Sequence, residues 1–161
     1  MSVLVAYCSQ HGTTAKCAQE IASQLGDGVT LVNLAETTPK VSDFDQVVLG
    51  GSIHAGQVQR EIKAFCSQQE QALLKVPLAL FLCCVNTNQF ELQLEKAFPT
   101  SLREHALIAV HCGYGYPLEK MGLFPKLVLR MVAKVTASEE HINHEAIQQL
   151  ANAVRTGALT V

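Results

Sequence analysis

The stretch Val3-Leu-Val-Ala-Tyr-Cys-Ser-Gln-His-Gly-Thr-Thr14 decides the fold, because a short apolar run leads through a polar loop into a helical pattern. The run Val3–Tyr7 predicts a strand that is buried on both faces. Apolar residues at helical spacing predict a helix after the loop, over Thr13–Leu25. The amide groups at the start of that helix, together with the positive end of its dipole, favour a bound phosphate. A well-capped helix without a ligand is the alternative.

Strand and helix patterns alternate along the rest of the chain. Four more strands are predicted from apolar runs at Val29–Asn33, Gln46–Leu49, Leu78–Val85 and Leu107–His111. Helices are predicted from Val58 to near Leu74, over Gln89–Phe98, and from an N-cap at Asn143 to Gly157. Uniformly apolar strands between helices are typical of an α/β domain whose parallel sheet is covered on both faces. One doubly wound domain over residues 1–161 is therefore predicted, with ligands beyond the carboxyl ends of the strands.

Composition excludes several classes of protein. The 161 residues are 48% hydrophobic and only 16% charged, with a formal net charge of −2, whereas a disordered chain needs low hydrophobicity and high charge. The balanced charge also argues against nucleic-acid binding. The longest apolar run, Val76–Val85, has about half the length of a membrane-spanning helix. Because the N-terminus lacks the pattern of a signal peptide, a cytoplasmic location is expected.

The six cysteines form no CxxC pair and are predicted to be buried as small apolar residues rather than joined in disulfides. If the strand order is 2-1-3-4-5, Cys84 and Cys112 end neighbouring strands, which leaves a redox pair open as the alternative to packing. His141 and His144 form a lone HxxH without any further ligand pattern, so no metal site is expected.

Three further loops are expected beside the first, at the carboxyl ends of the strands. Gly50–Gly56 should be a loop, because its first two glycines are expected to end the third strand; it carries His54, which suits proton transfer near neutral pH. An exposed loop histidine is the alternative. Cys84–Asn88 offers polar side chains and backbone amides. Cys112–Pro117 combines glycines, which let a ligand approach closely, with a tyrosine that can stack on a ring. A plain tight turn is the alternative there.

The first loop resembles the FMN phosphate loop of flavodoxins, [ST]-x-[ST]-G-x-T. Ser9, Gly12 and Thr14 match this pattern, while His11 stands where Ser or Thr is usual and the chain has no Trp. The resemblance implies a flavodoxin-like three-layer sandwich with a five-stranded parallel sheet of order 2-1-3-4-5, and FMN as the cofactor. It implies a cofactor site composed of Ser9, Gln10, His11, Gly12, Thr13, Thr14, Ser52, Ile53, His54, Ala55, Gly56, Val85, Asn86, Thr87, Asn88, Gly113 and Tyr114.

A narrower resemblance, to the menaquinone-dependent protoporphyrinogen oxidases, rests on Gly50–Gly56, the Val85-Asn86 pair, Tyr116-Pro117 and the segment Pro125–Val135. It implies an FMN-dependent oxidoreductase of heme biosynthesis that takes hydrogen from a porphyrinogen and passes electrons to a membrane quinone. His54 is the catalytic residue that we expect in such an enzyme.

The segment Pro125–Val135 predicts an apolar helix with a single basic stripe, formed by Lys126, Arg130 and Lys134. Such a helix suits a membrane surface or a groove for an apolar substrate. On the first interpretation the protein lies peripherally on the inner face of the cell membrane. Burial on the domain, or at the interface of a homodimer, is the alternative.

Two other functions remain open. The first is a flavodoxin-type soluble electron carrier that meets a redox protein partner, although such carriers are usually strongly acidic and the net charge here is −2. The second is a flavin-free interaction domain, which His11 and the missing Trp allow.

Overall fold

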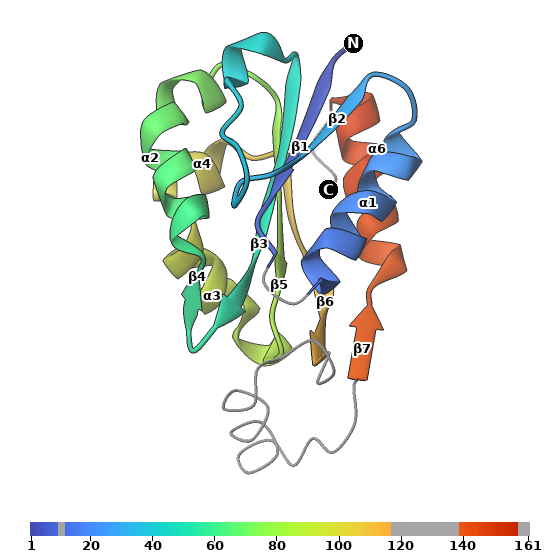
Figure 1. Cartoon of the computed structure of the whole chain (residues 1–161), viewed down its shortest axis with the longest axis vertical. Coiled ribbons are helices and arrows are strands. Elements are labelled where there is room, and N and C mark those ends of the chain that lie inside the picture. Colours follow the sequence, from blue (N-terminus) through green and yellow to red (C-terminus); the bar gives the residue numbers. More distant parts are fainter. Residues whose placement is uncertain (10–11, 117–138, 158–161) are drawn as a thin grey trace.

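The computed structural model describes residues 1–9, 12–116 and 139–157 and has a central sheet between two layers of helices (Figure 1). In chain order the elements are β1 (Val3–Tyr7), α1 (Thr13–Leu25), β2 (Val29–Asn33), η1 (Val41–Asp43), β3 (Gln46–His54), β4 (Gln57–Val58), α2 (Arg60–Leu73), β5 (Leu78–Cys83), η2 (Thr87–Gln89), α3 (Phe90–Ala97), α4 (Thr100–His105), β6 (Ile108–Tyr116), β7 (Glu139–Ile142) and α6 (His144–Thr156).

Within the described residues, the sheet has the strand order β2-β1-β3-β5-β6-β7, with β4 paired to β3. The strands from β2 to β6 along this path pair in parallel, so the predicted α/β class and the order 2-1-3-4-5 are confirmed. Two short antiparallel strands enlarge the predicted five-stranded sheet, because β4 folds back on β3 and β7 lies along β6 at the edge. Neither has the apolar run that marks a buried strand in a sequence.

Each face of the sheet carries its own core, because successive side chains of a strand point to opposite faces. In β1, Leu4 belongs to the core shared with α2, α3 and α4, while Val5 belongs to the core shared with α1 and α6. Leu80 and Phe81 of β5 divide in the same way. Figure 1 shows these two groups of helices on opposite sides of the sheet, which is the predicted three-layer arrangement.

The prediction that Gly50 and Gly51 end the third strand is wrong, since β3 continues to His54. A side chain at residue 50 would overlap the ring of Phe81 in β5, so this glycine makes room for an aromatic neighbour rather than breaking the strand. The helix that was expected from Val58 begins at Arg60, because the two preceding residues form β4.

The last predicted parallel strand is also longer than expected, because β6 continues to Tyr116 and places Gly113 and Tyr114 in a strand rather than in a loop. Its pairing with β5 shifts register after Leu82, and Cys112 is the extra residue of this bulge. Gly113 has a φ of 127°, and a side chain there would overlap the carbonyl oxygen of His141 in β7. The edge of the sheet therefore depends on a glycine that lets the β7 backbone lie against β6.

Other sequence predictions concern helices and cysteines. The helix predicted over Gln89–Phe98 is confirmed as α3, and the short α4 that follows was not expected. All six cysteines are buried with free thiols, as predicted. The segment Pro125–Val135 lies outside the described residues. Of the helices that the structure describes, none combines the length and the apolar character needed to cross a bilayer.

Gly113→Ala should destabilise the fold strongly, because the new methyl group adds a backbone clash to a positive φ. We expect the free energy of unfolding, measured by guanidinium denaturation, to fall by about 3 kcal/mol or more. Gly157→Ala is the matched control, since its φ is 63° and nothing lies within 4 Å of the added atom; its loss should be about 1 kcal/mol. Equal losses at the two positions would contradict the close approach of β7.

Candidate functional site

The carboxyl ends of four parallel strands, β1, β3, β5 and β6, meet at one edge of the sheet, the lower edge in Figure 1, where α1 begins. The register aligns these ends, because Tyr7 pairs with Gly50, Ser52 with Cys83, and Cys83 with Gly113. The four segments that the sequence predicted as ligand loops therefore start at the same edge. Ligand sites of doubly wound sheets lie in this position.

The loop between β1 and α1 has the polarity that an anionic ligand needs. Gly12 is left-handed, with a φ of 95°, and its N–H donates to Ser9 Oγ at 3.0 Å. Because that hydroxyl accepts this bond, its own O–H can donate to a ligand. Among the described residues no side chain caps α1, and the first turn contains no acidic residue. Gln10 and His11 lie outside the described residues.

The two threonines that open α1 make contacts within the protein. Thr13 Oγ1 donates to Glu140 Oε1 at 3.4 Å, and Lys16 Nζ lies 3.0 Å from Glu140 Oε2. Thr14 is buried, and its hydroxyl contacts the thiol of Cys83. A phosphate-binding role for these two hydroxyls stays a prediction, and it requires them to turn from these partners. Their backbone amides need no such movement.

The segment that was expected to be the second ligand loop is a hairpin made by β3 and β4. Its two-residue turn has positive φ at both positions, 50° at Ala55 and 76° at Gly56. This is the geometry of a tight type I′ turn, in which alanine is an unusual residue. Ile53 and His54 lie half-buried at the end of β3, directly before the turn. Regular strand backbone therefore positions His54.

No sequence pattern marks Gln59, yet its side chain ties together the ends of β1 and β3. Its Oε1 accepts from the N–H of Ser52 at 3.0 Å, while its Nε2 donates to the Cys8 carbonyl at 3.2 Å and to Ser52 Oγ at 2.6 Å. Ser52 Oγ in turn lies 2.9 Å from His54 Nε2. Only the unexpected hairpin carries residue 59 back over the strand ends, so no spacing in the sequence could have shown this contact.

The residues that follow β5, Val85–Asn88, are all exposed at the same edge, with Val85 exposing 47% of its surface. His111 of β6 is a second residue that the sequence did not single out for the site. Its Nε2 lies 2.7 Å from the Cys84 carbonyl oxygen, and its ring meets Phe90 edge to face, with centroids 5.8 Å apart. This histidine therefore anchors the start of the exposed segment to β6.

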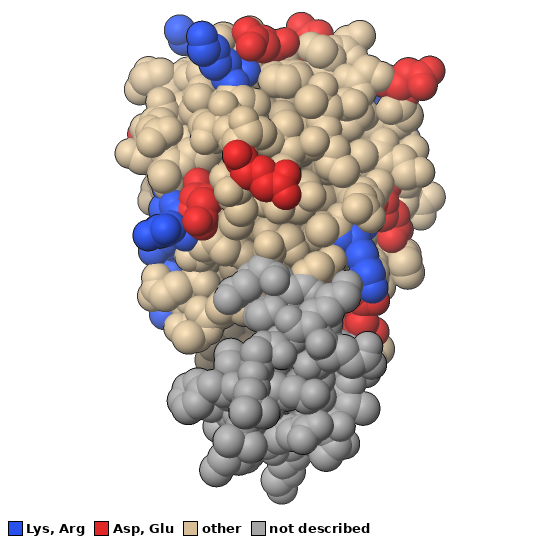
Figure 2. Space-filling model, viewed as in Figure 1, with Lys and Arg blue, Asp and Glu red and all other residues tan. Residues whose placement is uncertain are grey.

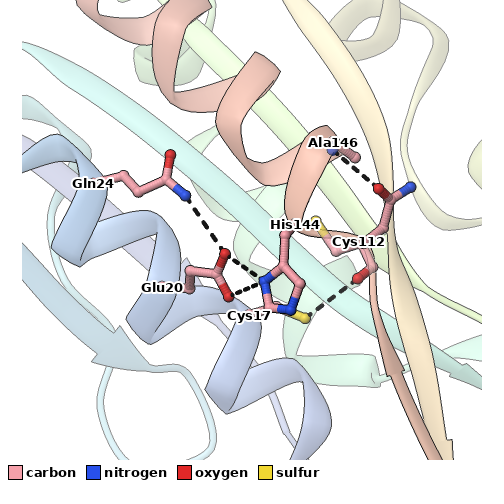
Figure 3. A network of polar contacts seen from close by, with 7 residues as sticks. Cys17, Glu20, Gln24, Cys112, His144 and Ala146 are labelled. Atoms are coloured by element: carbon pink, nitrogen blue, oxygen red, sulfur yellow. Dashed lines mark hydrogen bonds and ion pairs between the residues drawn. The ribbon is translucent and has the colours of Figure 1, made fainter.

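The two histidines of the HxxH pattern contact different partners. His141 lies in β7, where its ring centroid is 5.2 Å from that of Tyr114. His144 opens α6, and its Nδ1 is 2.8 Å from Glu20 Oε1 of α1 (Figure 3). No group of three potential ligands suited to a metal ion occurs in the part of the chain that the structure describes.

The cysteines that come together differ from the pair considered in the sequence. Cys17 Sγ lies 3.8 Å from Cys83 Sγ and 3.6 Å from the Cys112 carbonyl oxygen, the second contact being drawn in Figure 3. Cys84 Sγ instead lies 3.9 Å from the carbonyl oxygen of Asn86. The contact with Cys17, together with burial, raises the pKa of both Cys83 and Cys112. Cys84 and Cys112 are both free thiols, and Cys112 lies with Cys17 and Cys83 in the core shared with α1 and α6.

The sequence matches the family model of the flavodoxin domain over residues 4–143. The chain belongs to this family. The matched residues extend from β1 to the N-cap of α6 and so include all four segments at the carboxyl edge of the sheet. Among curated proteins, none matches the sequence.

Solved structures of flavodoxins share the fold of this flavodoxin domain. A short-chain flavodoxin associated with a non-canonical PDU bacterial microcompartment has a TM-score of 0.61 and 14% identity, over 98% of this chain and 99% of that one. A flavodoxin from the domain Archaea has a TM-score of 0.55 and 14% identity, over 96% and 99%. A mutant Fusobacterium nucleatum flavodoxin bound to flavin mononucleotide has a TM-score of 0.51 and 15% identity, over 68% and 67%. Identities this low show a common fold.

Cys8 directly follows β1 of this flavodoxin domain, and its thiol lies 3.8 Å from Glu61 Oε2. Burial, together with the Glu61 carboxylate, raises the pKa of Cys8 from 9.0 to about 11. The unfolded chain releases this proton near pH 9.0, whereas the folded chain keeps it to about pH 11. The free energy of unfolding therefore falls as the pH rises through this window.

Cys8→Ala should lose less stability than the wild type between pH 9 and pH 11, measured by guanidinium denaturation in the presence of a reductant. Glu61→Gln should reduce the loss by a smaller amount, because the burial of the thiol remains. Glu91→Gln, in the first turn of α3, is the control and should leave the pH dependence unchanged. An alkaline loss of the same size in Cys8→Ala would show that this thiol ionises alike in both states.

Proposed function

We propose that this flavodoxin domain binds FMN and transfers electrons. The observation that carries the proposal is the first turn of α1, which has no side-chain cap among the described residues and lies at the edge where β3, β5 and β6 also end. A helix start of this kind favours the phosphate of a ligand whose remaining groups lie along the strand ends. The FMN bound to the Fusobacterium nucleatum flavodoxin supports the same ligand here.

The donors at the loop suit a phosphate held without basic side chains. The Ser9 O–H and the backbone amides of Thr13 and Thr14 are neutral donors, and the left-handed Gly12 turns the loop between them. Glu140, the acidic residue that contacts Thr13, is paired with Lys16, which offsets its charge near the helix start.

The remaining predicted residues suit the flavin ring. Ser52–Gly56 and Val85–Asn88 would flank it, and Gly113 and Tyr114 lie at the same edge. When bound, FMN supplies the redox chemistry. The protein would bind the cofactor through the loop and orient it with the hairpin and the exposed segment after β5.

The surface suits a partner that is recognised through short-range contacts rather than through a strong electric field. Figure 2 shows scattered charged side chains separated by uncharged surface on the face in view. The net charge of the chain is only −2. Val85 adds an exposed apolar contact at the site. We propose a redox protein partner whose association depends weakly on salt, because long-range steering requires a larger charge.

The same weak charge favours a second candidate, the quinone-linked oxidation of a porphyrinogen. An apolar substrate and a membrane quinone would bind more favourably to uncharged surface at the site, and the exposed side chain of Val85 contributes to such a surface. On this proposal the protein is cytoplasmic and peripheral on the inner face of the cell membrane. Pro125–Val135, which we propose for contact with the membrane or with a second copy of the chain, lies outside the described residues.

FMN binding is tested by titrating the apo-protein and following the quenching of flavin fluorescence. Gly12→Asp should weaken FMN binding about 100-fold, because it places a carboxylate beside the phosphate and loses the left-handed glycine. Gly26→Asp is the matched control at the other end of α1, with a φ of 82° and open space around it, and should leave FMN affinity unchanged. The affinities of the two variants for riboflavin, which lacks the phosphate, should differ much less than their affinities for FMN.

Failure of the folded wild-type protein to bind FMN would overturn the proposal and favour a flavin-free interaction domain. Equal weakening in Gly12→Asp and Gly26→Asp would place the phosphate elsewhere.

The two redox candidates are separated by an anaerobic assay of the FMN-loaded protein. As an electron carrier, it should exchange electrons with a flavodoxin reductase at a rate that changes less than about threefold with salt. It should form no porphyrin from porphyrinogen, with or without menaquinone. Porphyrin fluorescence that rises only with menaquinone, and is lost in Gly12→Asp, would favour the second candidate instead.

A further inference from the structure

A continuous line of hydrogen bonds leads from the end of β1 to the imidazole of His54. Gln59 Nε2 contacts the Cys8 carbonyl at 3.2 Å and Ser52 Oγ at 2.6 Å, and Ser52 Oγ contacts His54 Nε2 at 2.9 Å. The direction of these bonds follows from backbone groups that can only donate or only accept.

The orientation of the Gln59 carboxamide is determined at both ends. A backbone N–H can only donate, so the atom 3.0 Å from the Ser52 nitrogen must be Oε1. A backbone carbonyl can only accept, so the atom 3.2 Å from the Cys8 oxygen must be Nε2. The –NH₂ group has two protons, and these go to the Cys8 carbonyl and to Ser52 Oγ.

The Ser52 hydroxyl therefore accepts from Gln59 and has one proton to donate. Ser52 is buried, and among the described residues the contacts of its hydroxyl are Gln59 Nε2, which is a donor, and His54 Nε2. A proton on His54 Nε2 would leave the buried hydroxyl proton without an acceptor, which carries a free-energy cost. The lone pair of Nε2 is thus the acceptor, and a neutral imidazole of this form carries its proton on Nδ1.

We propose that His54 is kept as the neutral tautomer with its proton on Nδ1, so that it serves the ligand as a hydrogen-bond donor and not as a general base. Ser52 and Gln59 are its positioning residues. The ligand group that suits this donor is an acceptor, such as a carbonyl oxygen or an unprotonated ring nitrogen of the flavin; this part of the proposal rests on FMN binding. On this proposal a donor role replaces the proton-transfer role expected at His54 from the sequence, because Ser52 occupies the lone pair that a general base would use.

The tautomer is measured on the apo-protein, labelled with ¹⁵N-histidine, by long-range proton–nitrogen NMR at pH 8, with the His54 signals assigned from their loss in His54→Gln. The wild type should show a protonated Nδ1 and an unprotonated Nε2. Ser52→Ala removes the donor to Nε2, and the ratio of the two tautomers should move toward Nε2–H by about tenfold. Ser52→Thr keeps the hydroxyl and should keep the wild-type tautomer.

Gln59→Glu should keep the contacts among residues 59, 52 and 54 but reverse the direction in which the Ser52 hydroxyl donates. Both oxygens of the new carboxylate only accept, so the Ser52 hydroxyl turns its proton toward the carboxylate and away from His54. His54 should then carry its proton on Nε2. The NMR signals of His144, which lies on α6 and pairs with Glu20 of α1, serve as the internal control and should not move.

An Nε2–H tautomer in the wild type would overturn the proposal, as would an unchanged Nδ1–H tautomer in folded Ser52→Ala and Gln59→Glu. FMN is then added to the labelled wild type. A shift of the His54 Nδ1–H signal supports the donor role, and an unmoved signal with FMN bound, as judged by flavin fluorescence, overturns it. Because the tautomer is measured before FMN is added, failure of FMN binding is a separate result.

Discussion

The parallel pairing of β1 with β3 is the constraint on which the rest of the molecule depends. Parallel strands cannot be joined by a tight turn, so each connection has to cross the sheet, as α1 and α2 do. The carboxyl ends of the parallel strands then point to one edge, and the pairing of Tyr7 with Gly50 aligns those of β1 and β3. The β1–α1 loop, the β3–β4 hairpin and the segment after β5 adjoin one another for this reason.

Close approach of backbone and side chains completes the edge. Gly50 leaves room for Phe81, Gly113 lets the β7 backbone lie on β6, and Gly115 lies so close to Thr13 that a side chain would overlap its hydroxyl. The last two contacts bring β6 and β7 against the start of α1. The first turn of that helix is therefore positioned by packing as well as by the loop that precedes it.

Polar contacts at the site are short and local. Gln59 joins the end of β1 to Ser52, and His111 joins β6 to the chain that leaves β5. Such bonds orient groups at the strand ends, whereas the scattered charges of Figure 2 supply no strong field. A site of this kind suits a bound cofactor with a neutral environment better than it suits charge-steered capture of a partner.

The sequence by itself determined the class, the order of the parallel strands and the edge at which the candidate site lies. It could do so because apolar runs such as Val3–Tyr7 and the helical spacing of Thr13–Leu25 are local, and because the resemblance of Ser9–Thr14 to flavodoxins supplied the strand order. Only the tertiary structure decided that β3 and β6 continue beyond their glycines and that the thiol of Cys17 lies beside that of Cys83. It also decided that Gln59 contacts Ser52, which in turn contacts His54. The physical reason is the same in each case. A glycine, a thiol or a carboxamide has no fixed preference of its own, and its role is set by the atoms that distant parts of the chain bring against it.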